Sequence, residues 1–328
     1  MTTARNEIAK PMVDLSIIIV SWNTADLLSA CLESILTDPQ VGIGDAPPAG
    51  IHIELIIVDS ASSDGTPALL ATRFPQIITL PQTENVGFTR GNNIGLAQAK
   101  GRHLLLLNPD TQVLPGALKM MLDYLDAHPD VGILGPHTLN SDGSPQSTRR
   151  RFPTLLIGLL ESTWLQPLAP RSLLDTYYVN DVSDDAIVDV DWVQGSALMA
   201  RRAVYEQIGG LDEGFIMYSE ELDWCRRAKN AGWRVIYLGT ARIVHHGGKS
   251  SQQVAARTHI LFQQSKLRYF RKYHGALAAQ MLRFVLLANY VVQLAIEFMK
   301  RMLGHKPDLR RERIQIYWQV LRSGLRVQ

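Results

Sequence analysis

Short apolar runs alternate with stretches of helical periodicity through the first half of the chain. Residues 15–20 (LSIIIV) form a continuous apolar run, which is typical of a strand buried on both faces. Similar runs predict four more strands, at residues 51–58, 77–80, 104–107 and 131–134. Helices are predicted between them at residues 24–36, 64–73, 88–100 and 115–127. This alternation predicts an α/β fold with a mostly parallel, Rossmann-like sheet that has helices on both faces.

The second half of the chain is less regular. Residues 137–189 contain several prolines and no clear periodicity, which indicates an insertion. Strand character returns at residues 192–200 and in short extended pieces at 234–237 and 241–244. A helix is predicted over residues 218–231, ended by Gly232.

Two more helices are predicted near the C-terminus. Residues 258–273 are basic and amphipathic, and residues 276–299 are strongly apolar. The polar residues of the second helix fall on one stripe, formed by Arg283, Asn289, Gln293, Glu297 and Lys300. Its apolar stretch is shorter than the roughly 20 residues of a spanning helix. An interfacial membrane helix and a helix packed on the α/β domain both remain open.

Composition and charge narrow the class of protein. A hydrophobic content of 46% is ordinary for a folded domain, and a net charge of +2 gives no reason to expect nucleic acid. Residues 300–328 carry eight Lys or Arg against two acidic residues, which suits an anionic membrane surface. Two cysteines make no disulfide framework, and residues 1–14 lack a signal-peptide core. We expect a cytoplasmic protein.

Polar side chains follow the predicted strands, where parallel sheets bind ligands. Ser21 to Thr24 follow the first strand, and a run from Asp59 through Asp64 follows the second. The local pattern suits a nucleotide site or a structural turn in which Asp64 or Thr66 caps a helix. Asn108-Pro109-Asp110 follows a later strand, where an acid either holds a divalent cation or belongs to a proline turn.

Acidic and histidine residues gather further along the chain. Glu220, Glu221 and Asp223 open the helix over residues 218–231, either as partners of its dipole or as a buried general base. His245 and His246 precede Gly247-Gly248-Lys249-Ser250 and form a candidate metal or phosphate site. The alternative is a structural role for each histidine.

These motifs together resemble those of the family 2 glycosyltransferases with the GT-A fold, within the rhamnosyltransferase-like cell-wall and O-antigen group. The resemblance rests on seven motifs in the family's order: IIIVSWNT, LIIVDSASSDGT, ENVGFTRGNN, LLLLNPDT, VQGSALMARR, GGLDEGFIMYSEELDWCRRAKNAGWRV and VHHGGKS. It implies a GT-A domain over residues 14–250, with a nucleotide-binding half (14–136) and an acceptor and catalytic half (137–250). A tail (1–13) precedes this domain, and a helical, membrane-associated region (251–328) follows it.

The resemblance also assigns roles to individual residues. Asp59 matches the acid that contacts the donor's base, and the same nucleotide-sugar site includes Asn23, Thr24, Asp64, Asn85, Gly87, Asn92, Asn93 and Asn108. Asp110 matches the retained acid of the metal motif and His245 a metal-ligating histidine, which implies Mg²⁺ or Mn²⁺. Glu221 matches the catalytic base, with Glu220 and Asp223 as neighbouring candidates. Asn108 replaces the first Asp of the metal motif, and Glu221 replaces the usual Asp of the base motif.

The implied activity is inverting transfer of a sugar, first rhamnose from dTDP-rhamnose and next a hexose from a UDP-sugar. The acceptor is a glycan or a lipid-linked glycan at the inner face of the cell membrane. A sugar nucleotidyltransferase or a nicotinamide dehydrogenase would need a glycine-rich loop after the first strand, where the chain has Ser21-Trp22-Asn23-Thr24. An inactive, membrane-associated nucleotide-sugar-binding subunit remains as an alternative. The oligomeric state stays open.

Overall fold

The computed structural model describes residues 13–43, 50–161, 163–247 and 255–326. The N-terminal half of the sheet is parallel and is centred on β1 (Leu15–Ser21). β1 pairs in parallel with β3 (Ile51–Asp59) and β5 (His103–Leu107), and β2 (Val41–Ile43) and β4 (Ile78–Pro81) each pair in parallel with β3. The predicted Rossmann-like half is confirmed.

The sheet continues with mixed strand directions in its second half. β12 (Ala197–Arg201) is antiparallel to both β5 and β7 (Val131–Leu139), whereas β13 (Arg234–His245) runs parallel to β7. Further antiparallel strands are β10 (Ile187–Val190), β6 (Thr111–Val113) and β8 (Pro145–Gln146). β9 (Arg149–Arg150) and β11 (Trp192–Val193) form a separate two-stranded sheet. The predicted strand over 192–200 is thus two strands, and the extended pieces at 234–237 and 241–244 are one.

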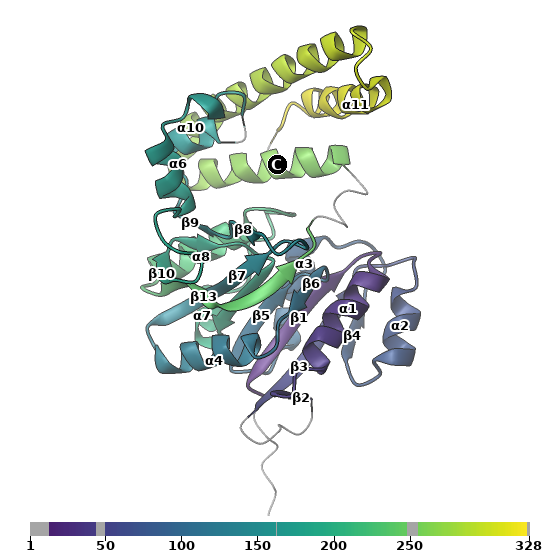
Figure 1. The fold of residues 1–328 in the computed structure, drawn as a ribbon, viewed down its shortest axis with the longest axis vertical. Helices are drawn as coiled ribbons and strands as arrows, with labels where there is room; N and C mark the ends of the chain where they lie inside the picture. Colours follow the sequence, from purple (N-terminus) through teal and green to yellow (C-terminus); the bar gives the residue numbers. More distant parts are fainter. Residues whose placement is uncertain (1–12, 44–49, 162, 248–254, 327–328) are drawn as a thin grey trace, which may run out of the picture.

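Helices cover both faces of the sheet, because alternate residues of β1 face opposite cores (Figure 1). Ile17 and Ile19 face α1 (Ala25–Leu36), α2 (Thr66–Arg73) and α4 (Ala117–Ala127). Ile18 faces α3 (Phe88–Gln98), α7 (Arg202–Ile208) and α8 (Glu220–Asn230). Cys31 lies in the first core and Cys225 in the second, both as free thiols.

Two predicted helix starts are corrected by the structure. α8 begins at Glu220 rather than at residue 218, because Tyr218 and Ser219 have left-handed backbone angles, with φ of 69° and 63°. Thr24 occupies the N-cap position of α1, but its side chain does not cap the helix. The carboxylate of Asp64 accepts the Ala25 N–H at 3.0 Å instead. Gly232 follows α8 with φ of 95°, as predicted.

The segment 137–189 contains α5 (Leu155–Leu160), the 3₁₀ turn η1 (Gln166–Leu168) and α6 (Arg171–Tyr178), and α5 packs against a helical arm. The arm consists of α10 (Ala255–Met302), which is broken at Gly275 with φ of 89°, and α11 (Pro307–Ser323). In Figure 1 the arm lies above the sheet domain, with the two halves of α10 running in different directions. Leu282, Leu286 and Val320 of the arm share one core with Phe215 and Leu222 of the sheet domain.

Candidate active site

A cleft of about 230 Å³ lies at the carboxyl ends of β1, β3 and β5 and against the start of α8. Its lining includes six of the predicted site residues, Asn85, Gly87, Asn108, Asp110, Glu220 and Glu221. The other predicted residues, Asn23, Thr24, Asp59, Asp64, Asn92, Asn93, Asp223 and His245, are not among the described residues that line it. Most of them contact or neighbour a lining residue, as follows.

Glu220 and Glu221 begin α8 on one wall of the cleft. Tyr218 and Ser219 just before them hold two successive left-handed conformations, a strained arrangement typical of functional sites. Glu220 is buried and Glu221 is half-buried, and one carboxyl oxygen of each is enclosed without a hydrogen-bond partner among the described residues. Burial and repulsion from Glu221 raise the pKa of Glu220 well above its ordinary value, while burial raises the pKa of Glu221. Glu221 is the more exposed of the two carboxyls, so water stabilises its charged form better.

Asp223 lies one residue beyond this pair but makes different contacts. It is fully buried, and one carboxylate oxygen is 2.8 Å from Nε of Arg227 on the same helix. The other oxygen is 2.7 Å from Nζ of Lys272 and accepts the Tyr273 hydroxyl proton at 2.8 Å. Both carboxylate oxygens of Asp223 are thus engaged, and the contacts with Lys272 and Tyr273 join α8 to α10.

Asp110 lines a second wall of the cleft and meets His245, although the two residues are far apart in the sequence. Because β6 pairs with the end of β13, the Nε2 atom of His245 lies 3.3 Å from Oδ1 of Asp110. Both side chains are buried, at 5% exposure for Asp110 and 8% for His245. His246 differs from its neighbour, since its Nδ1 lies 2.7 Å from the hydroxyl of exposed Ser141.

Gln146 on β8 fixes the orientation of the His245 ring. Its Oε1 lies 3.0 Å from Nδ1 of His245, and its Nε2 donates to the His245 carbonyl and to Oδ1 of Asn140, both at 2.8 Å. The two donated bonds set the amide orientation, so Oε1 accepts the Nδ1 proton. Nε2 of His245 is thereby directed at Asp110, as in metal sites whose histidines are oriented by an outer hydrogen bond.

Asn108 adds a third polar group to this wall. Its Nδ2 is 3.4 Å from Nε2 of His245, and its buried Oδ1 has no partner among the described residues. No group of three His, Cys, Asp or Glu side chains that could together hold a metal ion occurs within the described parts of the chain. The donor set is therefore one carboxylate, one imidazole and one unpaired amide oxygen, which suits a divalent cation that keeps other ligands.

The predicted nucleotide residues lie at the neighbouring strand ends. Asp59 ends β3 beside Ser21 of β1, is 3% exposed, and accepts the Ser62 N–H at 3.3 Å. Thr24 is buried with its hydroxyl 3.0 Å from that of Ser21. Asn23 has φ of 52°, and its Oδ1 accepts the Ser63 N–H at 2.8 Å. These contacts hold the turns after β1 and β3 together.

Asp64 belongs to the same pair of turns but faces two helices. One carboxylate oxygen accepts the Ala25 N–H and the other accepts the Thr66 N–H, both at 3.0 Å. Hydrogen bonds, including that of Thr66, hold the pKa of Asp64 below its ordinary value despite partial burial. The carboxylate therefore caps the N-termini of α1 and α2.

The loop before α3 borders the cleft through Asn85 and Gly87. Oδ1 of Asn85 accepts the Gly87 N–H at 3.0 Å, and Gly87 has φ of 77°, which favours glycine. Asn92 donates to the Phe88 carbonyl at 3.0 Å within α3. Asn93 donates to the Leu211 carbonyl at 2.9 Å, which joins α3 to the loop before α8. The hydrogen bonds of Asn92 and Asn93 thus support α3 and the loop before α8, and neither side chain lines the cleft.

Several lining residues were not singled out from the sequence. They include Trp22, Gln194, Gly195, Ser196, Tyr218 and Arg257. A Cβ atom on Gly195 would lie 3.5 Å from Cβ of Glu221, so this glycine packs against the base candidate. The sequence signal that could have identified Gly195 is its position as a glycine inside the apolar strand pattern of the motif VQGSALMARR. Gln146 lies in the irregular insertion and gave no signal. Gly248, Lys249 and Ser250 lie outside the described residues.

Comparison with known proteins identifies the family. Residues 16–209 match the sequence profile of glycosyl transferase family 2. The chain is 31% identical over 210 residues to the N-acetylglucosaminyl-diphospho-decaprenol L-rhamnosyltransferase of Mycobacterium tuberculosis, covering 61% of this chain and 68% of the relative. It is 24% identical over 283 residues to the rhamnosyltransferase WbbL of Escherichia coli, covering 78% and 92%.

Solved structures support the fold. A mannosyltransferase from Pyrobaculum calidifontis in complex with GDP-Man and Mn²⁺ is similar with a TM-score of 0.52 at 18% identity, covering 95% of this chain and 84% of that one. GalNAc-T7 with UDP, GalNAc and Mn²⁺ is similar with a TM-score of 0.55 at 13% identity, covering 80% and 48%. The GT-A fold predicted from the motifs is confirmed. The chain belongs to glycosyl transferase family 2 and is a glycosyltransferase.

Proposed function

We propose that this glycosyltransferase moves a sugar from a nucleoside diphosphate to an acceptor hydroxyl with inversion at the anomeric carbon. The observation that carries the proposal is a single cleft lined by both sets of candidate groups. Glu220 and Glu221 line it at the start of α8, and Asp110, which contacts His245, lines it after β5. A base and a diphosphate-binding group that share one space suit a direct displacement.

Glu221 is the proposed general base. It is half-buried at the cleft surface, where its charged form is better solvated than that of its buried neighbour Glu220. As the acceptor oxygen bonds to the anomeric carbon, the Glu221 carboxylate takes the hydroxyl proton, and the bond from that carbon to the diphosphate oxygen breaks. Glu220 keeps its proton and is a poor nucleophile. One working carboxylate therefore favours inversion, by the logic that separates the two classes of glycosidase.

Asp110, His245 and Asn108 are the proposed holders of Mg²⁺ or Mn²⁺. A bound cation would neutralise charge that develops on the leaving diphosphate. The imidazole favours Mn²⁺-like ions, which tolerate nitrogen ligands better than Mg²⁺ does. The two similar folds solved with Mn²⁺ support this choice.

The relatives support rhamnose as the first donor sugar and a lipid-linked saccharide as the acceptor. One relative is named for rhamnosyl transfer to a decaprenol-linked N-acetylglucosamine diphosphate, and another is a rhamnosyltransferase. We infer dTDP-rhamnose as the preferred donor, followed by UDP-sugars, in synthesis of a cell-surface polysaccharide. The Asp59 carboxylate is the proposed reader of the pyrimidine base.

The second half of α10 carries the proposed membrane contact. Two of its polar side chains are buried against the protein: Glu297 is 3% exposed and lies 2.8 Å from Arg310 of α11, and Asn289 accepts the Trp164 N–H at 2.9 Å. Some of its apolar side chains, such as Leu282 and Leu286, are buried as well, but others turn outward, with Leu277 and Phe284 exposed by 76% and 75%. An outer face with large exposed apolar side chains suits apolar surroundings.

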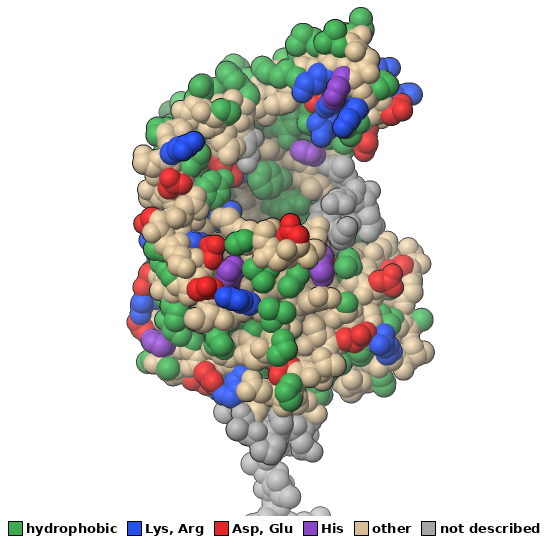
Figure 2. Space-filling model, in the orientation of Figure 1, with side chains coloured by type: hydrophobic (Ala, Val, Ile, Leu, Met, Phe, Trp, Pro, Cys, Tyr) green, Lys and Arg blue, Asp and Glu red, His purple; other side chains and the backbone are tan. Residues whose placement is uncertain are grey.

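Charge at the end of the arm supports the same contact. Figure 2 shows hydrophobic side chains along the upper rim of the molecule, with Lys and Arg side chains gathered beside them. Within the described residues, one helix, Ala256–Met302, is long and apolar enough to cross a membrane by length and composition. Gly275 breaks that helix, and the buried Glu297–Arg310 pair lies on its inner side. We therefore propose peripheral attachment to the inner face of the cell membrane.

Release of nucleoside diphosphate tests the proposal. The full-length protein is incubated with dTDP-rhamnose and a panel of UDP-sugars, with Mn²⁺, Mg²⁺ or EDTA, and with a lipid-linked N-acetylglucosamine diphosphate acceptor. We expect acceptor-dependent release that EDTA abolishes, and a product whose anomeric configuration is opposite to that of the donor. The alternative, an inactive nucleotide-sugar-binding subunit, predicts donor binding without release.

A further inference from the structure

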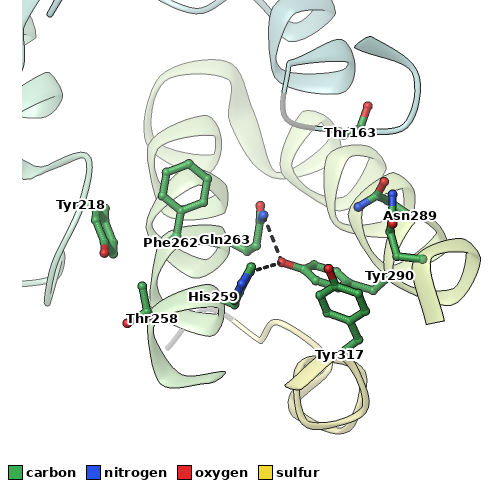
Figure 3. A pocket seen from close by; sticks show the side chains of 10 residues that line it. Thr163, Tyr218, Thr258, His259, Phe262, Gln263, Asn289, Tyr290 and Tyr317 are labelled. Atoms are coloured by element: carbon green, nitrogen blue, oxygen red, sulfur yellow. Dashed lines mark hydrogen bonds between the residues drawn. The ribbon is translucent and has the colours of Figure 1, made fainter. Parts of the chain in front are cut away.

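A second cavity, the helical cavity, lies between the helical arm and the catalytic cleft. Its volume of about 440 Å³ is in the range of small-ligand sites. Figure 3 shows its side chains coming from both halves of α10, from α11 and from loops of the sheet domain. Tyr218 and Thr258 line both the helical cavity and the catalytic cleft, so the two spaces adjoin.

The lining of the helical cavity is neutral, aromatic and rich in amides. Its residues are Thr163, Tyr218, Thr258, His259, Phe262, Gln263, Asn289, Tyr290, Gln293 and Tyr317. Within this described set no side chain is Lys, Arg, Asp or Glu. A phosphate site would need cationic groups, and a site for a lipid chain would need an apolar wall without three amides. The lining suits a neutral ligand with both hydroxyl groups and C–H faces.

A hydrogen-bond network holds the aromatic wall in place. The Tyr290 hydroxyl lies 3.2 Å from Nδ1 of His259 and accepts from Nε2 of Gln263 at 3.4 Å, as the dashed lines in Figure 3 show. The rings of Tyr290 and Tyr317 meet edge to face, with centroids 5.6 Å apart. Burial lowers the pKa of His259, so the ring is neutral at physiological pH. The wall is therefore uncharged and ordered.

The side-chain oxygen of Gln263 accepts no hydrogen bond from the described residues. The residue is 5% exposed, and its Nε2 is engaged by Tyr290, yet its buried Oε1 has no partner among the described residues. Leaving a buried amide oxygen unpaired is unfavourable, and native structures usually satisfy such atoms. A hydroxyl group of a ligand in the helical cavity would satisfy it.

We propose that the helical cavity binds a neutral saccharide unit of the acceptor. Aromatic rings would pack on the C–H faces of the sugar, and Gln263 would accept a hydrogen bond from one of its hydroxyls. The cavity adjoins the catalytic cleft at Tyr218 and Thr258, so a saccharide bound in it would lie next to the cleft that Glu221 lines. This inference rests on the proposed function, since it assigns the acceptor half of the same reaction.

The test compares Gln263→Leu with Gln264→Leu in the full-length protein. Gln264 is the next residue of α10, is half-buried, and is not among the residues that line the cavity, with its Nε2 bonded to the Arg326 carbonyl at 2.8 Å. Two acceptors are used, with N-acetylglucosamine diphosphate joined to either a decaprenyl or a short isoprenyl chain. Losing one hydrogen bond should raise the acceptor KM about tenfold in Gln263→Leu, with both acceptors and with an unchanged donor KM.

A second variant tests the same cavity in case Gln263→Leu does not fold. Tyr317→Ala, at a half-buried position, should also raise the acceptor KM while donor binding stays at the wild-type level. Unchanged acceptor KM in both folded variants would overturn the inference, as would an equal change in Gln264→Leu. An effect confined to the decaprenyl acceptor would also overturn it, because the cavity would then contact the lipid. A wild-type protein that releases no nucleoside diphosphate would instead contradict the proposed function itself.

Discussion

Removal of Gln146 should weaken divalent-cation binding without removing a cation ligand. Gln146 accepts the Nδ1 proton of His245 at 3.0 Å, and this bond keeps Nε2 directed at Asp110. Loss of such an outer hydrogen bond typically lowers metal affinity about 10- to 100-fold, or about 1.4–2.8 kcal/mol. Gln146→Leu keeps much of the side-chain volume and removes the acceptor. We expect a loss of Mn²⁺ affinity in this range.

Titration calorimetry of Mn²⁺ in the presence of dTDP measures the effect directly. Gln146→Glu restores an acceptor at the same position and should bind Mn²⁺ within a fewfold of wild type. His246→Ala is the matched histidine control, because its ring bonds Ser141 rather than Asp110. Unchanged Mn²⁺ affinity in a folded Gln146→Leu variant would refute the reasoning, and so would a larger loss in His246→Ala.

Three further predictions concern Glu220 beside the proposed base, the nucleotide site and the membrane contact. In the folded state Glu220 holds its proton more tightly than in the unfolded chain, so stability falls as pH rises above its unfolded pKa of about 4.3. Glu220→Gln should raise Tm at pH 8 but not at pH 4, and a Tm gain equal at both would contradict this. Asp59→Ala should weaken dTDP binding by about 1.5–3 kcal/mol in calorimetry, and unchanged affinity would exclude base contact. Phe284→Asp should lower flotation with anionic liposomes, and equal flotation would place the membrane contact elsewhere.

The sequence predicted the sheet well because its strands are buried on both faces. The strands β1, β3 and β5 are buried along their whole length and are mostly apolar, and such runs are typical of central strands in a parallel sheet. Helix starts were less certain, since they depend on tertiary contacts. The start of α1 is capped by Asp64, which is distant in the chain, and periodicity carries no trace of that bond.

The sequence revealed some residues of the site better than others. Asp110 and His245 were paired through motif order, and the pairing of β6 with β13 brings them within 3.3 Å. Gln146 sits on a two-residue strand in an irregular segment, where no pattern marks a functional residue. Asp223 shares a helix turn with Glu220, and only its contacts with α10 distinguish it from the base candidates.

The helical arm was the hardest region to interpret. Its polar stripe was visible in the sequence, but the direction of that stripe depends on α11, which pairs Arg310 with Glu297. An amphipathic pattern alone does not tell which face meets the protein. The structure buries Asn289 and Glu297 and leaves Phe284 exposed, and the exposed apolar side chains of this helix carry the membrane proposal.

Turnover of Glu221→Gln is the most direct test of the account. The variant keeps the shape of the side chain but removes the proton acceptor. Turnover of the donor with a lipid-linked acceptor should fall about 10²–10⁴-fold, with dTDP-sugar affinity close to wild type. Near wild-type turnover in Glu221→Gln, with turnover lost instead in Glu220→Gln or Asp223→Asn, would contradict the proposed mechanism.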